Sequence, residues 1–263
     1  MVRSSEPRDE RILGLLEGRE QVSVGELATL LGVSEVTIRK DLDALERSSL
    51  VERIRGGARL RATEEGPLSL RLGRRVAAKR AVARRAAELV GPEHVIALDS
   101  SSTGYYLALE LAGRDDVTVV TNSLRVATQL GERSGVDVVL LGGSVRRTSF
   151  STVGFPPELL RGYGRIDIAF LGVSALSVEQ GLLERSFSEA ETKRAIAAAS
   201  SRVVALFDSS KAEGFGPHSV VGAEAVSRLI TDADFDEAEA EGWLAAGVQV
   251  DRVAVSIPPA ERL

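Results

Sequence analysis

The chain has no cysteine and only two histidines, His94 and His218, among its 263 residues. It can therefore form no disulfide, no thiolate metal site and no cysteine nucleophile, and its two histidines are too far apart in sequence to make a metal cage alone. No apolar run approaches the roughly 20 residues that span a bilayer. The charged N-terminus lacks the apolar core of a secretory signal. We expect a cytoplasmic protein with no membrane partner, and no cofactor is indicated.

The charge is distributed unevenly along the chain. Residues 1–87 carry 18 Lys+Arg against 13 Asp+Glu, whereas residues 88–263 carry 15 against 25. The basic excess does not come from residues 1–62, where the two signs balance, but from residues 66–87, with seven basic and no acidic side chains. Such a contrast between the halves of a chain hints at an anionic partner.

Residues 8–60 carry the pattern of three short helices followed by a β-hairpin. Ser23 and Glu26 have capping-box spacing at the start of the second helix, and Ser34 is a good N-cap for the third. Apolar residues at i, i+4 and i+7 give the third helix one buried face, formed by Ile38, Leu42 and Leu45. The turn Arg55-Gly56-Gly57 joins two short strand-like segments. This order predicts a winged helix-turn-helix, whose third helix fits the major groove of DNA.

Polar residues on the third helix and the hairpin are candidates for DNA contact. They are Thr37, Arg39 and Lys40 on the helix, and Arg53, Arg55 and Arg59, which the hairpin would bring together. The two glycines of the turn would let the backbone approach a phosphate. Two alternatives remain open. The third helix can be an ordinary surface helix with an Arg39–Asp43 pair, and the module can bind another protein.

From residue 76 onward, the pattern changes to strands that alternate with helices. Strands are expected at 95–98, 117–120, 136–141, 166–173, 202–207, 228–231 and 248–255, and helices at 76–90, 103–113, 123–133, 189–199 and 236–246. This alternation predicts an α/β domain with an open, mostly parallel sheet. Residues 61–75 have no strong periodicity. We therefore predict a DNA-binding domain over 1–60, a linker over 61–75 and a second domain over 76–263.

Small polar groups follow most of the predicted strands. They lie at Asp99–Gly104, Thr121–Ser123, Gly142–Ser144, Gly172–Ser174 and Asp208–Lys211. Ligands of open α/β sheets bind beyond the carboxyl ends of the strands. Hydroxyls and helix N-termini can hold a phosphate, and the two aspartates could accept hydroxyls of a sugar, so a phosphorylated polyol suits this set. The alternative is that these residues are turns and N-caps.

Two motifs in the first module resemble the DeoR family of bacterial transcriptional regulators. Residues 34–42, Ser-Glu-Val-Thr-Ile-Arg-Lys-Asp-Leu, resemble the family's helix-turn-helix signature, and Arg55-Gly-Gly-Ala58 resembles the wing that follows it. The resemblance implies DNA contacts by Ser34, Thr37, Arg39, Lys40, Arg55 and Gly56.

The second domain resembles the same family in several blocks. Residues 99–103, 121–122, 141–143, 171–174, 191–194 and 208–211 match its motifs, although Ser101 stands where the family often has glycine. The resemblance implies a sensor domain similar in fold to ribose-5-phosphate isomerase that binds a phosphorylated sugar. The expected effector-binding residues are Asp99, Ser101, Ser102, Thr103, Thr121, Asn122, Gly142, Gly143, Asp208 and Lys211.

Together these features predict a DNA-binding regulator, expected to repress a carbohydrate-metabolism operon, with operator affinity controlled by a phosphorylated sugar. A homodimer or higher homo-oligomer is expected, because winged-helix regulators generally read paired half-sites. The alternative function is a sugar-phosphate isomerase or deaminase, for which Asp99, Asp208 and Glu191 are the candidate acid–base groups. Glu191 also has capping-box spacing from Ser188, and Lys193 behind it can face a ligand or be solvated.

Overall fold

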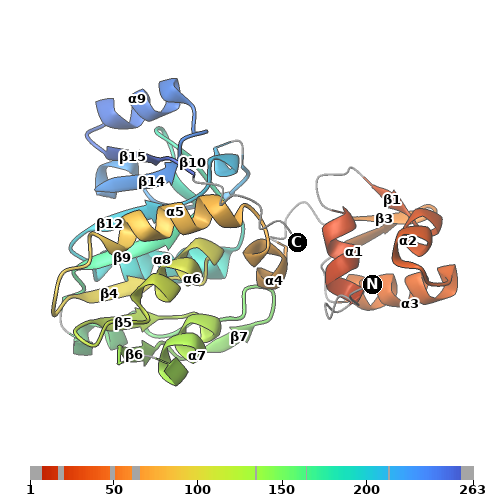
Figure 1. The fold of residues 1–263 in the computed structure, drawn as a ribbon, viewed down its shortest axis with the longest axis horizontal. Helices are drawn as coiled ribbons and strands as arrows, with labels where there is room; N and C mark the ends of the chain where they lie inside the picture. Colours follow the sequence, from red (N-terminus) through yellow and green to blue (C-terminus); the bar gives the residue numbers. More distant parts are fainter. Residues whose placement is uncertain are drawn as a thin grey trace, which may run out of the picture. The chain divides into compact units, whose positions relative to one another are not determined.

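The computed structural model describes residues 8–16, 21–47, 51–60, 66–133, 135–163, 165–212 and 214–255. The chain divides into two compact units, residues 1–73 and 74–263, whose elements are labelled in Figure 1. Each unit is described by itself. No helix within these ranges is long and apolar enough to cross a membrane.

The first unit consists of short helices and a small antiparallel sheet. Its elements are α1 Arg8–Leu16, β1 Val22–Ser23, α2 Val24–Leu31, α3 Glu35–Arg47, β2 Val51–Ile54, β3 Gly57–Leu60 and α4 Leu68–Leu72. The strand order is β1-β3-β2. One buried cluster joins α1, α2, α3 and the sheet, with Ile38 and Leu42 fully buried. This arrangement is the winged helix-turn-helix that the helix and hairpin pattern predicted.

Local capping explains where the helices of this unit begin and end. The Ser23 hydroxyl accepts a hydrogen bond from the Glu26 amide (3.1 Å), as the capping-box spacing predicted. Gly32 ends α2 in the left-handed region, with φ of 69°. The sequence pattern did not indicate α4, which lies inside the predicted linker and buries Leu68. Residues 61–65 of that linker lie outside the described ranges.

The second unit is built on a seven-stranded sheet. Its helices are α5 Val76–Ala87, α6 Ser102–Leu111, α7 Leu124–Arg133, α8 Phe187–Ala198 and α9 Glu237–Ala245, with short 3₁₀ helices η1 Pro157–Tyr163, η2 Ser209–Lys211 and η3 Ala223–Ala225. The strands of the large sheet are β4 Val95–Leu98, β5 Thr118–Thr121, β6 Asp137–Leu140, β9 Ile168–Gly172, β12 Val203–Leu206, β14 Arg228–Asp232 and β15 Gln249–Val253. Every neighbouring pair is parallel, which confirms the predicted α/β fold class.

The sequence pattern missed two small antiparallel sheets. One pairs β7 Ser144–Arg146 with β8 Ser151–Val153, and the other has the order β10 Ala175–Ser177, β11 Gly181–Glu184 and β13 His218–Val221. These strands are three or four residues long. Their segments, unlike the four-residue strands of the large sheet, were not part of a regular alternation of apolar runs and helices, so no strand was predicted there.

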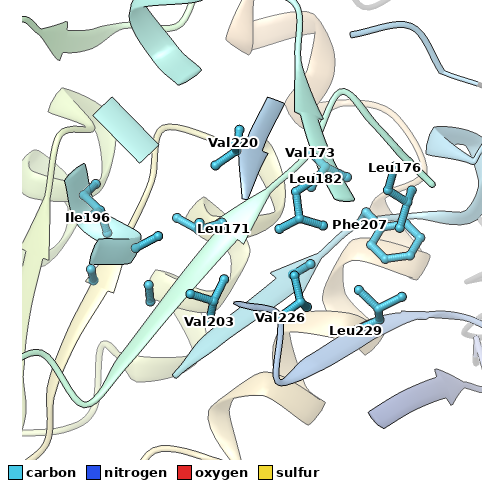
Figure 2. Packing of buried hydrophobic residues seen from close by; sticks show 14 of the residues in the cluster. Leu171, Val173, Leu176, Leu182, Ile196, Val203, Phe207, Val220, Val226 and Leu229 are labelled. Carbon is cyan, nitrogen blue, oxygen red and sulfur yellow. The ribbon is translucent and has the colours of Figure 1, made fainter. Parts of the chain in front are cut away.

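The core of the second unit attaches the three-stranded sheet β10-β11-β13 to the large sheet. Helices α5, α6 and α7 pack side by side on the large sheet (Figure 1). A separate buried cluster joins β9, β12 and β14 to α8 and to the three-stranded sheet. In Figure 2, Leu171 and Val203 of the large sheet lie opposite Leu182 and Val220 of the small one. Buried apolar side chains thereby attach the three-stranded sheet to the large sheet.

Candidate functional site

Helix α3 presents one exposed, mostly polar face away from its own core. Val36, Arg39, Lys40 and Asp43 are exposed, whereas Ile38, between them in sequence, is fully buried. A helix of this kind can enter the major groove with its N-terminal turns toward the base edges. The structure therefore places the predicted Arg39 and Lys40 on the accessible face of the helix.

The predicted contacts Ser34 and Thr37 are engaged with each other. The Ser34 hydroxyl accepts the Thr37 amide (3.2 Å) and lies 2.9 Å from the Thr37 hydroxyl. Ser34 thus caps α3, which was predicted, and fixes the start of the helix. Both residues therefore help to fix the start of α3.

Three arginines of α3 and the hairpin are held by acidic neighbours. Arg39 pairs with Glu35 (2.7 Å), Arg53 with Asp43, and Arg59 with Glu52 (2.9 Å). The alternative Arg39–Asp43 pair was therefore wrong, because the two residues choose different partners. Of the three arginines that the hairpin was predicted to bring together, Arg53 and Arg59 are thus paired with carboxylates. Their gathering at the hairpin stays a prediction. Lys40 and Arg55 are exposed and have no ion-pair partner among the described residues.

The two wing glycines serve different purposes. Gly56 is exposed with φ of 84°, so it forms the tight turn that brings Arg55 to the tip of the hairpin. Gly57 is buried, and a Cβ there would lie 2.3 Å from the Val22 carbonyl oxygen. Its missing side chain lets β1 pair with β3 and does not serve phosphate approach, so that part of the prediction was wrong.

Replacing Gly57 by alanine should destabilise the first unit by about 1–3 kcal/mol, the range for overpacking a close contact. The added Cβ meets backbone, which must move and weaken the pairing of β1 with β3. Gly66→Ala is the matched control, because a Cβ there meets nothing within 4 Å. Thermal unfolding of the two variants measures the difference. Equal unfolding temperatures would show that the close approach is not needed.

In the second unit, the strand order reverses beside β4. Sequence order runs from β4 through β5 to β6 on one side, while β9, β12, β14 and β15 follow on the other. Ligands of open parallel sheets bind at such a reversal. The Asp99 loop and the Gly172 turn flank it, and the Asp99 carboxylate accepts the Gly172 amide (2.7 Å) and the Ser101 amide (3.0 Å). The predicted strand-end residues therefore gather at one sheet edge.

A buried lysine, Lys193, contacts both the Asp99 loop and the Gly172 turn. The Lys193 ammonium lies 2.9 Å from the Asp99 carboxylate, donates to the Gly172 carbonyl (2.7 Å) and pairs with Glu184. Burial by itself would lower its pKa, but the carboxylates of Asp99 and Glu184 outweigh burial and raise the pKa of Lys193 above its ordinary value. The interpretation of Lys193 as a solvated residue was wrong, because its side chain is an internal clasp, buried and paired with two carboxylates. A role facing a ligand stays a prediction.

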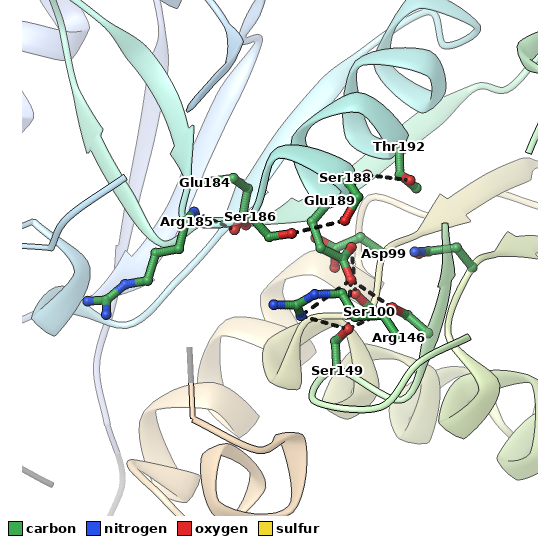
Figure 3. A network of polar contacts seen from close by, with 12 residues as sticks. Asp99, Ser100, Arg146, Ser149, Glu184, Arg185, Ser186, Ser188, Glu189 and Thr192 are labelled. Atoms are coloured by element: carbon green, nitrogen blue, oxygen red, sulfur yellow. Dashed lines mark hydrogen bonds and ion pairs between the residues drawn. The ribbon is translucent and has the colours of Figure 1, made fainter. Parts of the chain in front are cut away.

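Glu189 organises a second buried network, drawn in Figure 3. Its carboxylate accepts hydrogen bonds from Ser149 and Ser151 (both 2.7 Å) and from Ser100 (3.1 Å), and Arg146 lies 3.8 Å away. The network ties the β7–β8 hairpin to the Asp99 loop and to α8. Sequence analysis missed Glu189, although it precedes the Glu-Thr-Lys-Arg block that carried the family resemblance.

The predicted capping box at the start of α8 does not form. The helix begins at Phe187 after Ser186, and the Ser188 hydroxyl lies 3.0 Å from the Ser186 hydroxyl. Glu191 is instead exposed and pairs with Arg194 one turn later. It therefore contributes neither a cap nor an acid–base group at the sheet edge.

The Asp99 loop leads directly into α6. The Ser101 hydroxyl accepts the Gly104 amide (2.9 Å) and so caps the helix. A Cβ on Gly172 would lie only 2.2 Å from the Ser101 Cβ, so the two loops touch. The departure from glycine at Ser101 is accommodated because Gly172 opposite it has no side chain. Ser102 and Thr103 begin α6 and are buried at the same edge.

The remaining predicted residues flank this loop. The side-chain amide of Asn122 donates to the Thr152 carbonyl (3.0 Å). The Oδ1 atom of the same amide is buried and has no hydrogen-bond partner among the described residues. The Thr121 hydroxyl accepts the Ser123 amide (3.0 Å). Gly142 and Gly143 are exposed, and Gly143 has φ of 124° with the Val153 carbonyl close by. A buried polar atom without a partner needs an explanation, such as a bound water or a ligand.

Asp208 and Lys211 follow β12, which lies beside β9 on the side away from β4. Asp208 is buried, accepts from the Ser210 hydroxyl and lies 3.5 Å from the Arg75 guanidinium. Lys211 is half-buried, and its ammonium has no ion-pair partner among the described residues. It is therefore available to an anion.

The second unit also has a large surface cavity beside β11 and β13. It has a volume of about 720 Å³ and is lined among others by Leu183, Phe215, Ser219 and Glu224. None of the predicted effector residues lines it. Nor do the described residues hold any group of three or more histidines or carboxylates placed to bind a metal ion.

Comparison with known proteins covers both units. The profile of the DeoR-like helix-turn-helix domain matches residues 8–64, and that of the DeoR C-terminal sensor domain matches residues 74–233. The chain is 35% identical over 245 residues to the HTH-type transcriptional regulator GolR of Listeria innocua, covering 92% of this chain and 96% of GolR. It is 30% identical over 232 residues to the glycerol-3-phosphate regulon repressor of Escherichia coli, covering 88% and 90%.

Among solved structures, ribose 5-phosphate isomerase A from Methanocaldococcus jannaschii is similar at 21% identity and a TM-score of 0.39, over 51% of this chain and 53% of the isomerase. That likeness is too low to bear on function. The relatives that match almost the whole chain are DNA-binding regulators and not enzymes. The chain belongs to the DeoR family of transcriptional regulators, with the family's helix-turn-helix in its first unit and the family's sensor domain in its second.

Proposed function

We propose that the chain represses a carbohydrate-metabolism operon and that a phosphorylated sugar or related metabolite controls its affinity for the operator. The observation that carries this proposal is the presence of both family domains in one chain, a DNA-binding unit followed by a sensor. A relative that matches along most of the chain is named as the repressor of the glycerol-3-phosphate regulon. The proposed place of action is the cytoplasm, where the operator DNA lies.

On the DNA side, the proposed contacts are Ser34, Thr37, Arg39, Lys40, Arg55 and Gly56. Lys40 and Arg55 support the proposed DNA binding most directly, because their charges are exposed and unpaired within the described structure. Unpaired cations can release counterions from DNA phosphates without first breaking an ion pair. We propose that two copies bind paired half-sites, since such units read DNA as dimers.

On the sensor side, the proposed effector residues are Asp99, Ser101, Ser102, Thr103, Thr121, Asn122, Gly142, Gly143, Asp208 and Lys211. Their roles divide by chemistry. The start of α6 and Lys211 would hold the phosphate, and the unpartnered Asn122 oxygen would accept a sugar hydroxyl. Asp99 would keep the loop in place, because its oxygens already accept two backbone amides and meet the Lys193 ammonium.

A signal from this site has a short route to the start of the sensor unit. Arg75, the second residue of that unit, lies 3.5 Å from both the Asp208 and Asp232 carboxylates and 3.1 Å from Asp234. Its backbone has φ of 45°, which is unusual for a residue with a side chain. A ligand that moves the Asp208–Lys211 turn would disturb this cluster. Such a ligand can shift operator affinity only by binding one state more tightly than the other.

A panel of phosphorylated metabolites should contain a compound that raises the unfolding temperature of the protein, because a ligand that binds only the native state stabilises it. Lys211→Ala should weaken that compound about 10-fold or more, the loss expected for a charged hydrogen bond. Lys40→Ala is the matched control and should bind it normally. Thermal unfolding at increasing ligand concentration measures both affinities.

The same compound should release the protein from DNA chosen out of a random-sequence pool. Binding to this DNA should weaken steeply as salt concentration rises. An affinity that stays flat over a salt titration would contradict operator binding. Conversion of any sugar phosphate at enzyme-like rates would contradict the regulator assignment and favour the isomerase alternative.

A further inference from the structure

Val36 is a large apolar side chain that the first unit leaves in water. It is 60% exposed, and Leu30 on α2 is the only other large apolar side chain that is exposed in the described part of this unit. Leu30 lies on the preceding helix, whereas Val36 lies in the first turn of α3, the helix proposed to enter the major groove. Its place on that helix calls for an explanation beyond ordinary surface exposure.

The geometry of α3 directs Val36 away from the protein. Residues four apart lie on the same side of a helix, so Val36 shares its face with the exposed Lys40. Ile38 and Leu42, on the opposite face, are fully buried in the core of the unit. N-terminal residues of a recognition helix are the ones that reach base edges. Val36 therefore stands where a base contact is made.

Four of the polar residues around Val36 are occupied by one another, whereas Lys40 on the same face has no ion-pair partner among the described residues. Ser34 bonds to Thr37, and Glu35 pairs with Arg39. Val36 itself offers only methyl groups, which cannot pair with the donors and acceptors of a base. The C5-methyl of thymine is the apolar group on base edges in the major groove, and it is read by apolar side chains.

We infer that Val36 contacts the methyl group of a thymine in each operator half-site and thereby selects thymine at that position. This inference rests on the proposed binding of α3 to DNA, and it adds which base is read and by which residue. The contact requires no change in the fold, because the side chain already projects from α3.

Deoxyuridine provides a direct test, since it differs from thymidine only by the missing methyl group. Duplexes bound by the full-length protein are selected from a random-sequence pool, and each thymine of the half-site is then replaced singly by deoxyuridine. Equilibrium binding is measured at one fixed salt concentration. At one position the replacement should weaken binding about fourfold, as expected for the loss of one buried methyl group.

Val36→Ala should bind the thymine duplex about as weakly as the wild type binds the deoxyuridine duplex, and should no longer distinguish the two. The variant is expected to fold, because the side chain is exposed and alanine favours helix more than valine. Leu30→Ala removes a comparably exposed side chain and should keep the preference for thymine.

The outcomes separate this inference from the proposed function. If the wild type selects no DNA, the proposed function fails. If it binds DNA but no thymine is distinguished from deoxyuridine, or if Val36→Ala keeps the full preference, the Val36 contact is wrong while operator binding stands.

Discussion

Lys193→Met should lower the free energy of unfolding of the sensor unit by about 3–5 kcal/mol, the cost of removing one partner from a buried ion pair. Methionine fills a similar volume but leaves the carboxylates of Asp99 and Glu184 buried without their cation. It also leaves the Gly172 carbonyl without its donor. Urea denaturation followed by circular dichroism at neutral pH gives the difference. A Lys193→Met variant that does not fold at all would also agree with the loss of a buried ion pair.

Lys211→Met is the matched control, because this half-buried lysine has no ion-pair partner among the described residues, and it should change stability little.

The pH dependence of the wild type's stability supplies an independent check. Folding raises the pKa of Lys193 above its ordinary value of 10.5, so its stabilising contribution is complete below that pH and declines as pH rises beyond it. A Lys193→Met variant as stable as the wild type at neutral pH would contradict the internal clasp.

Operator affinity should fall about 100-fold when Lys40 and Arg55 are both replaced by alanine. The estimate takes the lower value of about 1.5 kcal/mol for each charged hydrogen bond. These two residues carry the exposed, unpaired charges of α3 and the wing within the described structure. The slope of log affinity against log salt should also become shallower by about 1 for each phosphate that the variant no longer binds. Fluorescence anisotropy with DNA selected by the wild type measures both quantities.

A double variant that removes the same charge elsewhere separates contact from general attraction. Arg165→Ala with Arg202→Ala removes two exposed arginines of the sensor unit, and the operator affinity should stay within a few-fold of the wild type. If both double variants lose affinity equally, net charge and not the α3–wing surface governs binding. The sensor should remain folded in both, as shown by unchanged stabilisation with the effector.

Much of the fold could be predicted because its signals are local. A capping hydroxyl and its amide are three residues apart at Ser23 and at Ser34, and the buried face of α3 repeats every three or four residues. The strands of the large sheet are apolar runs separated by helices, so their positions were predicted to within one or two residues at most ends. The turn at Gly56 likewise depends on one residue with positive φ.

Other features of the site depend on partners that are distant in sequence. The strand-end motifs were predicted, but Asp99 binds Gly172 across 73 residues and Ser100 binds Glu189 across 89. Nothing in the sequence near Lys193 shows that two carboxylates lie beside it in the core. The partner of Asp43 was mistaken for the same reason, since Arg53 reaches Asp43 from a different element. Arg39 pairs instead with Glu35, one turn earlier on the same helix.

The sequence by itself thus determined the order of the main helices and of the strands of the large sheet, the two-part organisation and the family, because periodicity, caps and contiguous motifs are properties of neighbouring residues. Only the tertiary structure decided which charges are satisfied inside the protein and which remain for a ligand. That decision requires the packing of distant segments, since a charge such as that of Lys193 becomes a structural clasp when carboxylates enclose it. Lys40, Arg55 and Lys211 keep their charges available because folding brings no described carboxylate to them.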